Sequence, residues 1–222
     1  MFTGLVEGTG TVLSIISSTH AAGPTRLTVS APGLAMRLRT GDSIAVSGVC
    51  LTALDISAEE FSADLAEETV RRTKLARLLP GSVVNLELPT PAGSPMGGHV
   101  VQGHVDGVGE LISLEPIDAL DRAKSDWRLK VRLPSEISKY VASQGSITVE
   151  GISLTVADFA ANILSIAIIP HTYAATSLRT LVPGSPVNIE VDVLAKYAEK
   201  LAQSAKQGGW TLTEEYLLTN GY

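Results

Sequence analysis

The sequence predicts an all-β protein made of two similar small barrels in tandem, followed by a C-terminal helix. Three observations support this prediction: an internal repeat, short β-type runs within each copy, and one amphipathic stretch after the second copy. The chain of 222 residues is 45% hydrophobic, so there is enough apolar material for two cores. Its length suits two domains of about 100 residues each.

The repeat consists of three blocks that return in the same order. Residues 4–14 match residues 103–113 at five of eleven positions, with an offset of 99. At an offset of 103, residues 43–55 match 146–158 at seven of thirteen positions, and residues 75–87 match 178–190 at eight of thirteen. The matches indicate a tandem duplication of a unit of about 95 residues. We expect the junction in the Pro- and Gly-rich segment 89–98, where periodicity lapses.

Each copy has the pattern of short strands. The segments SIAVSG and SITVEG alternate in polarity, and so do VVNLEL and PVNIEV. The most apolar run, 152–170, is interrupted by Asp158 and Asn162 and predicts two strands joined by a turn. Several short strands in a unit of this size favour a small closed barrel, because closure removes free sheet edges.

Helices are predicted at three places. A short one should begin at Pro134 with Ser135 as its cap, and another should lie within residues 67–79. The clearest follows Asp192 as its cap, and one face carries the residues Val193, Tyr197, Leu201 and Ala205. This stripe needs a partner surface, on its own domain or on another subunit. The predicted domains are therefore 1–96, 97–191 and, for the helix and tail, 192–222.

Composition and charge exclude several classes of protein. The net charge of −6 argues against a nucleic-acid-binding surface. The single cysteine cannot form an internal disulfide, which suits a reducing compartment. The first residues lack the features of a secretory signal, and no uninterrupted apolar run reaches the length of about 20 residues that a membrane span needs. We therefore expect a cytoplasmic protein that binds neither nucleic acid nor membrane.

Positions that are identical in the two copies are largely polar residues or glycine. We interpret Asn85 and its counterpart Asn188 as residues of local turns or interstrand hydrogen bonds. A threonine such as Thr52 or Thr155 alone would be an ordinary strand residue. Beside a recurring glycine and a neighbouring Cys or Ser, each favours the wall of a pocket.

The two copies differ where side chains can move protons. The counterpart of Cys50 is Ser153, the counterpart of His104 is Leu5, and His171 corresponds to Glu68. Cys50 alone is weak evidence, because a free cysteine is usually a small buried apolar residue. No zinc-binding signature is present, and the glycine-rich segment 4–12 leads into a strand rather than a helix, which argues against a phosphate loop. The asymmetry predicts two similar ligands that are treated differently.

Four motifs in order resemble riboflavin synthase of the type with two lumazine domains: MFTGLVEGTG, GDSIAVSGVCLT, GGHVVQGHVDG and GSITVEGISLTV. The resemblance extends from Met1 to about Leu201. It implies two six-stranded Greek-key barrels, each binding one molecule of 6,7-dimethyl-8-ribityllumazine. One lumazine gives a four-carbon unit to the other, which yields riboflavin and 5-amino-6-(D-ribitylamino)uracil in the last step of riboflavin biosynthesis.

The resemblance also implies an assembly. The family is typically a homotrimer held by C-terminal helices, with the active site between an N-terminal barrel and the C-terminal barrel of a neighbouring subunit. No metal or redox cofactor takes part, and lumazine synthase is a candidate partner.

The resemblance implies particular site residues. Catalysis is expected from Phe2, Thr3, Cys50, His104, Ser153 and Thr155. The pocket of the N-terminal barrel would consist of Gly4, Leu5, Val6, Cys50, Leu51, Thr52, Asp64, Leu65, Ala66, Glu67, Glu68 and Thr69. The pocket of the C-terminal barrel would consist of Gly103, His104, Val105, Ser153, Leu154, Thr155, Ala167, Ile168, Ile169, Pro170, His171 and Thr172.

The chain departs from the family in two places, and two other functions remain open. Gln144 stands where the family often has a lysine that reaches into a neighbour's site, and the segment NLELP lacks a basic residue usual there. A lumazine- or flavin-binding carrier without catalysis, or an interaction module, could use the same double barrel.

We expect His104 and Thr155, with Ser153, to move protons at one lumazine, and Cys50, with main-chain groups near Gly4 and Val6, to activate the other.

Overall fold

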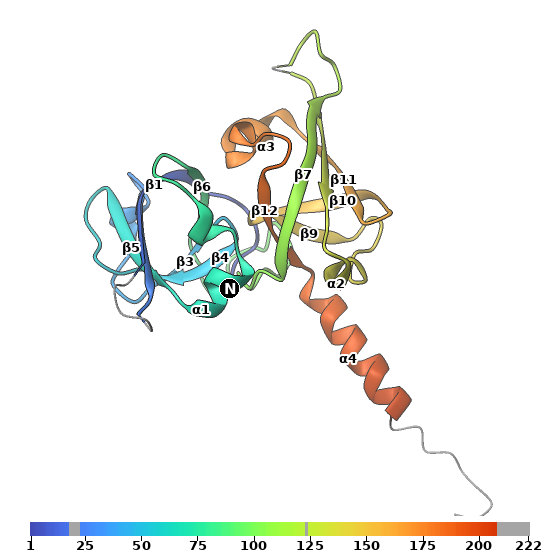
Figure 1. Cartoon of the computed structure of the whole chain (residues 1–222), viewed down its shortest axis with the longest axis horizontal. Helices are drawn as coiled ribbons and strands as arrows, with labels where there is room; N and C mark the ends of the chain where they lie inside the picture. Colours follow the sequence, from blue (N-terminus) through green and yellow to red (C-terminus); the bar gives the residue numbers. More distant parts are fainter. Residues whose placement is uncertain (18–22, 123, 208–222) are drawn as a thin grey trace, which may run out of the picture. The chain divides into compact units, whose positions relative to one another are not determined.

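A computed structural model describes residues 1–17, 23–122 and 124–207. The predicted tail from residue 208 onward therefore lies outside the described residues, as does His20. The chain divides into two units after Asp192, and each is described by itself. The first unit holds two β-sheets, coloured from blue to orange in Figure 1.

The N-terminal sheet has six antiparallel strands in the order β4-β3-β6-β1-β2-β5. Between β4 and β5, a two-residue bridge of Leu54 with Ser62 joins the two ends of this order. The strands are β1 (Gly8–Ser17), β2 (Thr25–Ser30), β3 (Ser43–Val46), β4 (Val49–Thr52), β5 (Glu60–Leu65) and β6 (Val83–Glu87).

The C-terminal sheet is a closed barrel with the order β10-β11-β8-β7-β12-β9. Read around the barrel, this is the same Greek-key order as in the first sheet, shifted by six strands. The strands are β7 (Gly107–Pro116), β8 (Trp127–Arg132), β9 (Ser146–Val149), β10 (Ile152–Ala160), β11 (Ile163–Ile168) and β12 (Pro186–Val191). The predicted fold class, two similar six-stranded barrels, is confirmed.

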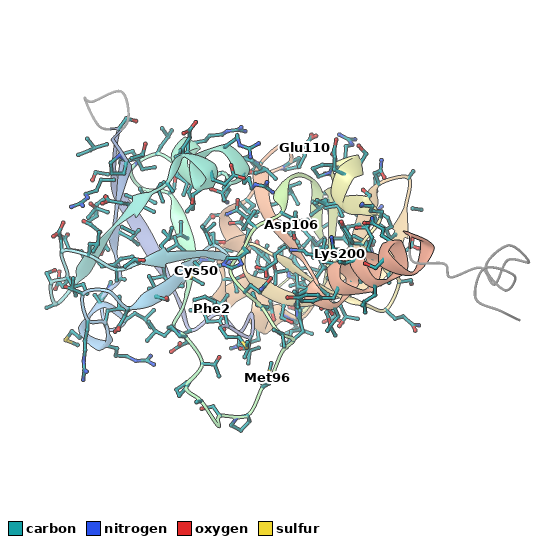
Figure 2. The ribbon with its side chains drawn as sticks, turned by 90° about the horizontal axis from the view of Figure 1, so that it is seen from below. Phe2, Cys50, Met96, Asp106, Glu110 and Lys200 are labelled. Atoms are coloured by element: carbon teal, nitrogen blue, oxygen red, sulfur yellow. The ribbon has the colours of Figure 1, made fainter. Side chains whose placement is uncertain are left out.

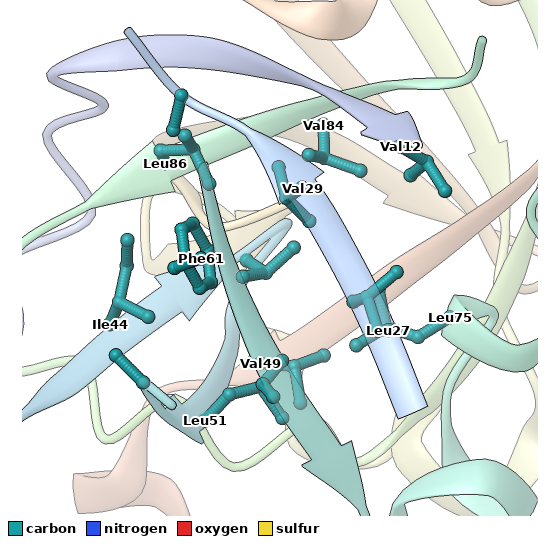
Figure 3. Close-up of a cluster of buried hydrophobic side chains, with 14 of the residues drawn as sticks. Val12, Leu27, Val29, Ile44, Val49, Leu51, Phe61, Leu75, Val84 and Leu86 are labelled. Carbon is teal, nitrogen blue, oxygen red and sulfur yellow. The ribbon is translucent and has the colours of Figure 1, made fainter. Parts of the chain in front are cut away.

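Each barrel encloses its own core, because alternate residues of a strand face opposite sides. In β8, Trp127, Leu129 and Val131 are buried, whereas Arg128, Lys130 and Arg132 are exposed. The core of the N-terminal barrel is shown in Figure 3, with Phe61 among Leu27, Val29, Ile44 and Leu86. Full burial of one such side chain stabilises the fold by about 1.5–3 kcal/mol. The run 152–170 forms β10 and β11 with a tight turn between them, as predicted.

The helices are short except for the last. They are α1 (Glu67–Arg72), α2 (Ser135–Ser138), α3 (Pro170–Ala175) and α4 (Val193–Gln207), with 3-10 turns η1 (Ala35–Arg37), η2 (Leu75–Arg77) and η3 (Ser177–Thr180). The helix expected within 67–79 is divided, because Thr73 adopts an extended conformation after α1. The prediction of Ser135 as a cap is wrong: Pro134 holds the cap position and Ser135 is the first helical residue.

Helix α4 begins and ends where the sequence predicts and forms the second unit. It exposes Leu194, Tyr197 and Leu201, with 67%, 64% and 71% of their surfaces accessible. Tyr197 and Leu201 belong to the predicted stripe, whereas Val193 is half-buried. None of the helices in the described ranges is long and apolar enough to cross a membrane.

The two barrels meet through reciprocal hydrogen bonds of Asn85 and Asn188. The Asn85 side chain donates to the Glu150 carbonyl (2.9 Å) and accepts from Ser177 N (2.7 Å). By the same geometry, Asn188 donates to the Ser47 carbonyl (2.9 Å) and accepts from Lys74 N (2.9 Å). The prediction of a local role for these asparagines is therefore wrong, since each one bridges to the other barrel.

Gly48 and Gly151 lie at the centre of this barrel contact. A Cβ atom on Gly48 would lie 2.8 Å from the backbone nitrogen of Gly151, and one on Gly151 would lie 2.5 Å from that of Gly48. Contacts this short are not tolerated, so both positions require glycine if the backbones are to approach so closely.

One feature breaks the local symmetry of the contact. Lys74 Nζ lies 2.6 Å from Glu150 Oε2, and both side chains are almost fully buried. At the equivalent place in the other half stand Ser177 and Ser47, and the Ser177 hydroxyl is buried without a hydrogen-bond partner in the described chain. A buried ion pair thus joins the N-terminal barrel to the C-terminal barrel on one side only.

Candidate active site

Two short segments precede the barrels and cross between them. We call residues 2–6 the first strap and residues 101–105 the second strap. Phe2 N donates to the Val101 carbonyl (2.9 Å), and Val101 N donates to the Phe2 carbonyl (3.1 Å). These two residues are equivalent in the repeat, so the straps are related by the same local two-fold symmetry as the barrels.

Each strap continues onto the barrel of the other half. The Gly4 carbonyl accepts from Ser153 N in β10 (2.8 Å), and the Gly103 carbonyl accepts from Cys50 N in β4 (2.8 Å). Beyond these points, Val6 contacts the core of the C-terminal barrel and Val105 lies in the core of the N-terminal barrel.

This crossing corrects the grouping of the predicted site residues. The sequence placed Gly4, Leu5 and Val6 with Cys50, and Gly103, His104 and Val105 with Ser153. The structure has the first strap beside Ser153 and the second strap beside Cys50. Sequence order groups a strap with the barrel that follows it, whereas the strand hydrogen bonds place it across the barrel contact.

The contact between strap and strand requires glycine in both halves. Gly4 and Gly103 have φ angles of 75° and 79°, in the left-handed region. A Cβ atom on Gly4 would lie 2.6 Å from Ser153 Cβ, and one on Gly103 would lie 2.6 Å from Cys50 Cβ. The repeated GLV and GHV segments therefore preserve a backbone wall directly beside the reactive side chains.

Cys50 lies in a small cluster at the meeting point of the straps. Phe2, Ala45 and Val101 are buried there, and Cys50 is half-buried against them. Phe2 and Cys50 of this cluster are labelled in Figure 2. Phe2 is only 1% exposed, so it acts here by packing beside the thiol. Thr3 is also buried, and its hydroxyl donates to Glu87 Oε1 (3.0 Å).

Ser153 has a partner that the sequence did not predict. His99 Nδ1 lies 2.8 Å from Ser153 Oγ. Burial lowers the pKa of His99, and the nearby negative charge of Asp192 opposes this shift. A neutral imidazole can accept the Ser153 proton or donate one to it, depending on its tautomer.

The motif GGHVVQGH contains both His99 and His104, but only His104 was among the predicted site residues. No local pattern in the sequence pairs His99 with Ser153, because the two residues lie 54 positions apart.

A second wall in each barrel comes from the end of β5 or β11. In the N-terminal barrel, Arg26 forms two hydrogen bonds with Asp64 (2.8 and 3.0 Å) and a further contact with Asp55. The hydrogen bonds from Arg26 lower the pKa of Asp64. The Asp64 carboxylate therefore stays ionised, and Arg26 donates a hydrogen bond to each of its oxygens.

The equivalent wall of the C-terminal barrel is open. Arg128 pairs with Ala167 in the strand register, as Arg26 pairs with Asp64, so the position of the Asp64 carboxylate is taken by an alanine in this barrel. A cavity of about 490 Å³ lies at this place, lined by Arg128, Lys130, Asp158 and Ala167 among others. The two walls thus differ in charge as well as in the exchange of Cys50 for Ser153.

The remaining predicted residues occupy these strands and the helices that follow. Leu51 is buried and Leu154 is half-buried, each against its barrel core, whereas Thr52 and Thr155 are exposed on the opposite face. His104 is exposed, and its backbone N–H donates to Glu190 Oε2 (3.1 Å). The predicted residues at the beginning of the two short helices are Ala66, Glu67, Glu68 and Thr69 at α1, and Ile169, Pro170, His171 and Thr172 at α3.

Gln144 does not lie on a strand. It has a φ angle of 63° in the turn before β9, and its N–H donates to the Val156 carbonyl (2.9 Å).

Comparison with known proteins assigns the chain to a family. The model of the lumazine binding domain matches twice, over residues 3–89 and 102–192. The riboflavin synthase of Mycobacterium tuberculosis is 43% identical over 210 residues, which cover 92% of this chain and 100% of the relative. The chain belongs to the riboflavin synthase family. The Bacillus subtilis member is 36% identical over 224 residues, with both chains fully covered.

One solved structure has a similar fold over most of the chain. The crystal structure of LumP complexed with riboflavin superimposes with a TM-score of 0.76 at 25% identity, covering 86% of this chain and 99% of LumP. Each of the two family matches contains one strap end and one complete barrel. This chain therefore carries two copies of one module.

Proposed function

We propose that the protein is a riboflavin synthase that converts two molecules of 6,7-dimethyl-8-ribityllumazine into riboflavin and 5-amino-6-(D-ribitylamino)uracil. The observation that carries this proposal is the pair of equivalent walls. They have the same backbone frame, but one presents the Cys50 thiol and the other presents the Ser153 hydroxyl with His99. A transferase that passes a four-carbon unit between two identical substrates needs one donor and one acceptor.

The pockets are proposed to follow the crossed grouping. One lumazine would contact Gly4, Leu5 and Val6 of the first strap together with Ser153, Leu154, Thr155 and the segment 167–172. The other would contact Gly103, His104 and Val105 of the second strap together with Cys50, Leu51, Thr52 and the segment 64–69. The strap carbonyls that bond Ser153 N and Cys50 N support this grouping.

The reaction requires mainly that the protein position its two substrates. The 7-methyl group of the lumazine is acidic, because its carbanion delocalises into the ring. Holding two rings in a reactive geometry can lower the barrier by about 7–11 kcal/mol. A placed proton-transfer group adds about 10²–10⁴-fold. Ser153 with His99, assisted by Thr155, is proposed to move protons at one lumazine, and Cys50, with His104 of the second strap beside it, is proposed to activate the other.

The assembly is proposed to be a homotrimer joined through α4. The exposed stripe of Leu194, Tyr197 and Leu201 supports this, since three large apolar side chains in one row need a partner surface. The site would then form between barrels of neighbouring subunits, with lumazine synthase as a candidate partner. The single cysteine supports a reducing compartment such as the cytoplasm.

The proposal is tested by supplying 6,7-dimethyl-8-ribityllumazine alone and following the absorbance of riboflavin. Formation of riboflavin without added cofactor, at half a molecule per lumazine consumed, is the expected result. Lumazine binding without turnover would instead indicate a carrier, and the absence of binding would indicate an interaction module.

A further inference from the structure

Each strap is held by one buried glutamate of the barrel that follows it in the sequence. Glu87 at the end of β6 accepts from Thr3 N (2.7 Å), from the Thr3 hydroxyl (3.0 Å) and from Gly4 N (3.1 and 3.2 Å). Glu190 in β12 accepts from Gln102 N (2.8 Å), Gly103 N (3.0 Å) and His104 N (3.1 Å). The two glutamates are equivalent in the repeat, in the segments VNLE and VNIE.

The environment explains why a carboxylate stands at both positions. Glu87 and Glu190 are 5% and 2% exposed, so the strap rather than water satisfies their oxygens. Several backbone N–H groups of one turn converge on each side chain, and only a carboxylate offers acceptor sites on both oxygens. Such charge-assisted hydrogen bonds are short and strong, and they fix the direction of the strap.

The strap that each glutamate holds completes the wall of the other barrel. Glu87 belongs to the N-terminal barrel and accepts a hydrogen bond from Gly4 N. The carbonyl of Gly4 in turn accepts from Ser153 N in the C-terminal barrel. Glu190 belongs to the C-terminal barrel and accepts a hydrogen bond from Gly103 N. The carbonyl of Gly103 in turn accepts from Cys50 N in the N-terminal barrel. The chain of contacts therefore crosses from one half to the other in both directions.

We propose that Glu87 and Glu190 are positioning residues that act in a crossed manner, Glu87 on the pocket at Ser153 and Glu190 on the pocket at Cys50. Loss of either carboxylate frees its strap, and the pocket of the opposite barrel loses its backbone wall. The link to catalysis rests on the proposed function, whereas the link to pocket geometry does not.

The geometry is tested with the single thiol of the full-length chain. The rate at which iodoacetamide alkylates Cys50 is measured in the wild type, in Glu190→Gln and in Glu87→Gln. We expect Glu190→Gln to change this rate by about tenfold, because the wall beside the thiol opens, and Glu87→Gln to leave it within about twofold.

The repeat supplies the matched experiment for the other pocket. The double substitution Cys50→Ser, Ser153→Cys moves the thiol to the equivalent position. The strap glycine is equally close there, since a Cβ atom on Gly4 would lie 2.6 Å from Ser153 Cβ, as one on Gly103 would from Cys50 Cβ. In this background we expect the reverse result, with the large change from Glu87→Gln and the small one from Glu190→Gln. If a Gln variant does not fold, Glu→Asp at the same position withdraws the carboxylate from the strap and takes its place.

Two results would overturn the proposal. One is an uncrossed pattern, in which each glutamate affects the thiol of its own barrel. The other is an equal effect of both variants on both thiols, which a general loss of stability would produce. With lumazine as substrate, both variants should lose about ten- to a hundredfold in kcat. A wild type that forms no riboflavin would refute the proposed function while leaving the thiol measurements interpretable.

Discussion

Cys50 and Ser153 occupy the same position of equivalent strands, but the residues that surround them differ. The thiol lies against Phe2 and Val101, whereas the hydroxyl lies 2.8 Å from the imidazole of His99. Because burial lowers the pKa of His99, its imidazole is neutral near pH 7 and can accept the Ser153 proton or donate one, depending on its tautomer. The exchange of one atom between the repeats therefore comes with a difference in the whole local environment.

His99 makes stability depend on pH. Since burial lowers the pKa of His99 in the folded protein, the unfolded chain takes up this proton first as the pH falls below about 6.5. The contribution of neutral His99 to the free energy of unfolding is fully present above about pH 6.5, and it is lost as the pH falls through the pKa of His99 in the folded protein. We expect the stability gap between the wild type and His99→Gln to shrink between pH 7.5 and pH 5, measured by urea unfolding. A gap that stays constant with pH would contradict this.

Gly103 should tolerate no side chain. Gly103→Ala combines the left-handed φ angle, which costs about 1–2 kcal/mol, with a contact at 2.6 Å to Cys50 Cβ. We expect kcat for riboflavin formation to fall about a hundredfold, because the wall beside Cys50 is displaced. Gly184→Ala is the control, since Gly184 has a φ angle of 87° and nothing within 4 Å of a new Cβ atom. The control should lose stability but retain activity, and equal losses of kcat would argue against a local effect.

At the scale of elements, the alternation of polar and apolar residues determines the strands, whereas long-range contacts determine where the short helices begin and end. The β8 pattern of buried and exposed residues can be read directly from the sequence. In contrast, the helical stretch 67–79 is divided at Thr73, where the hydroxyl donates to the Thr69 carbonyl and the next N–H, Lys74 N, turns to Asn188. A long-range hydrogen bond thus outweighs the local preference for helix.

Helix α4 should control the oligomeric state. A charge on its exposed stripe would be buried in any helix–helix contact, which is costly without a partner. We expect the double substitution Tyr197→Glu, Leu201→Glu to shift the protein to monomer in analytical ultracentrifugation, with a loss of riboflavin formation. Lys200→Gln, on the same helix, changes a charge without altering the stripe and should leave the oligomeric state unchanged. An unchanged sedimentation coefficient in the double variant would refute the role of the stripe.

At the scale of the molecule, the barrel contact combines a symmetric frame with one asymmetric ion pair. The asparagines bridge both ways, whereas Lys74 and Glu150 meet once. Two N-terminal barrels in this geometry would bury Lys74 opposite Ser47, and two C-terminal barrels would bury Glu150 opposite Ser177. The ion pair therefore favours the pairing of unlike barrels.

Breaking this ion pair should be expensive. Lys74→Met leaves the Glu150 carboxylate buried without its cation, at a cost of about 3–5 kcal/mol in the free energy of unfolding. The double variant Lys74→Met, Glu150→Gln should recover most of this, because the amide oxygen can still accept from Asn188 N, as Glu150 Oε1 does at 2.7 Å. Urea unfolding curves give both values, and additive losses would contradict the pairing.

The sequence alone determined the duplication, the β-type pattern of both copies, the last helix and the exchange of Cys50 for Ser153. These features are local or repeat at a fixed offset, so periodicity and alignment reveal them. Only the tertiary structure decided which strap completes which pocket, that Asn85 and Asn188 join the barrels, and that His99 meets Ser153. Each of these depends on contacts between segments tens of residues apart, with no trace in local pattern, because a backbone carbonyl or N–H can bond any segment that the fold brings to it.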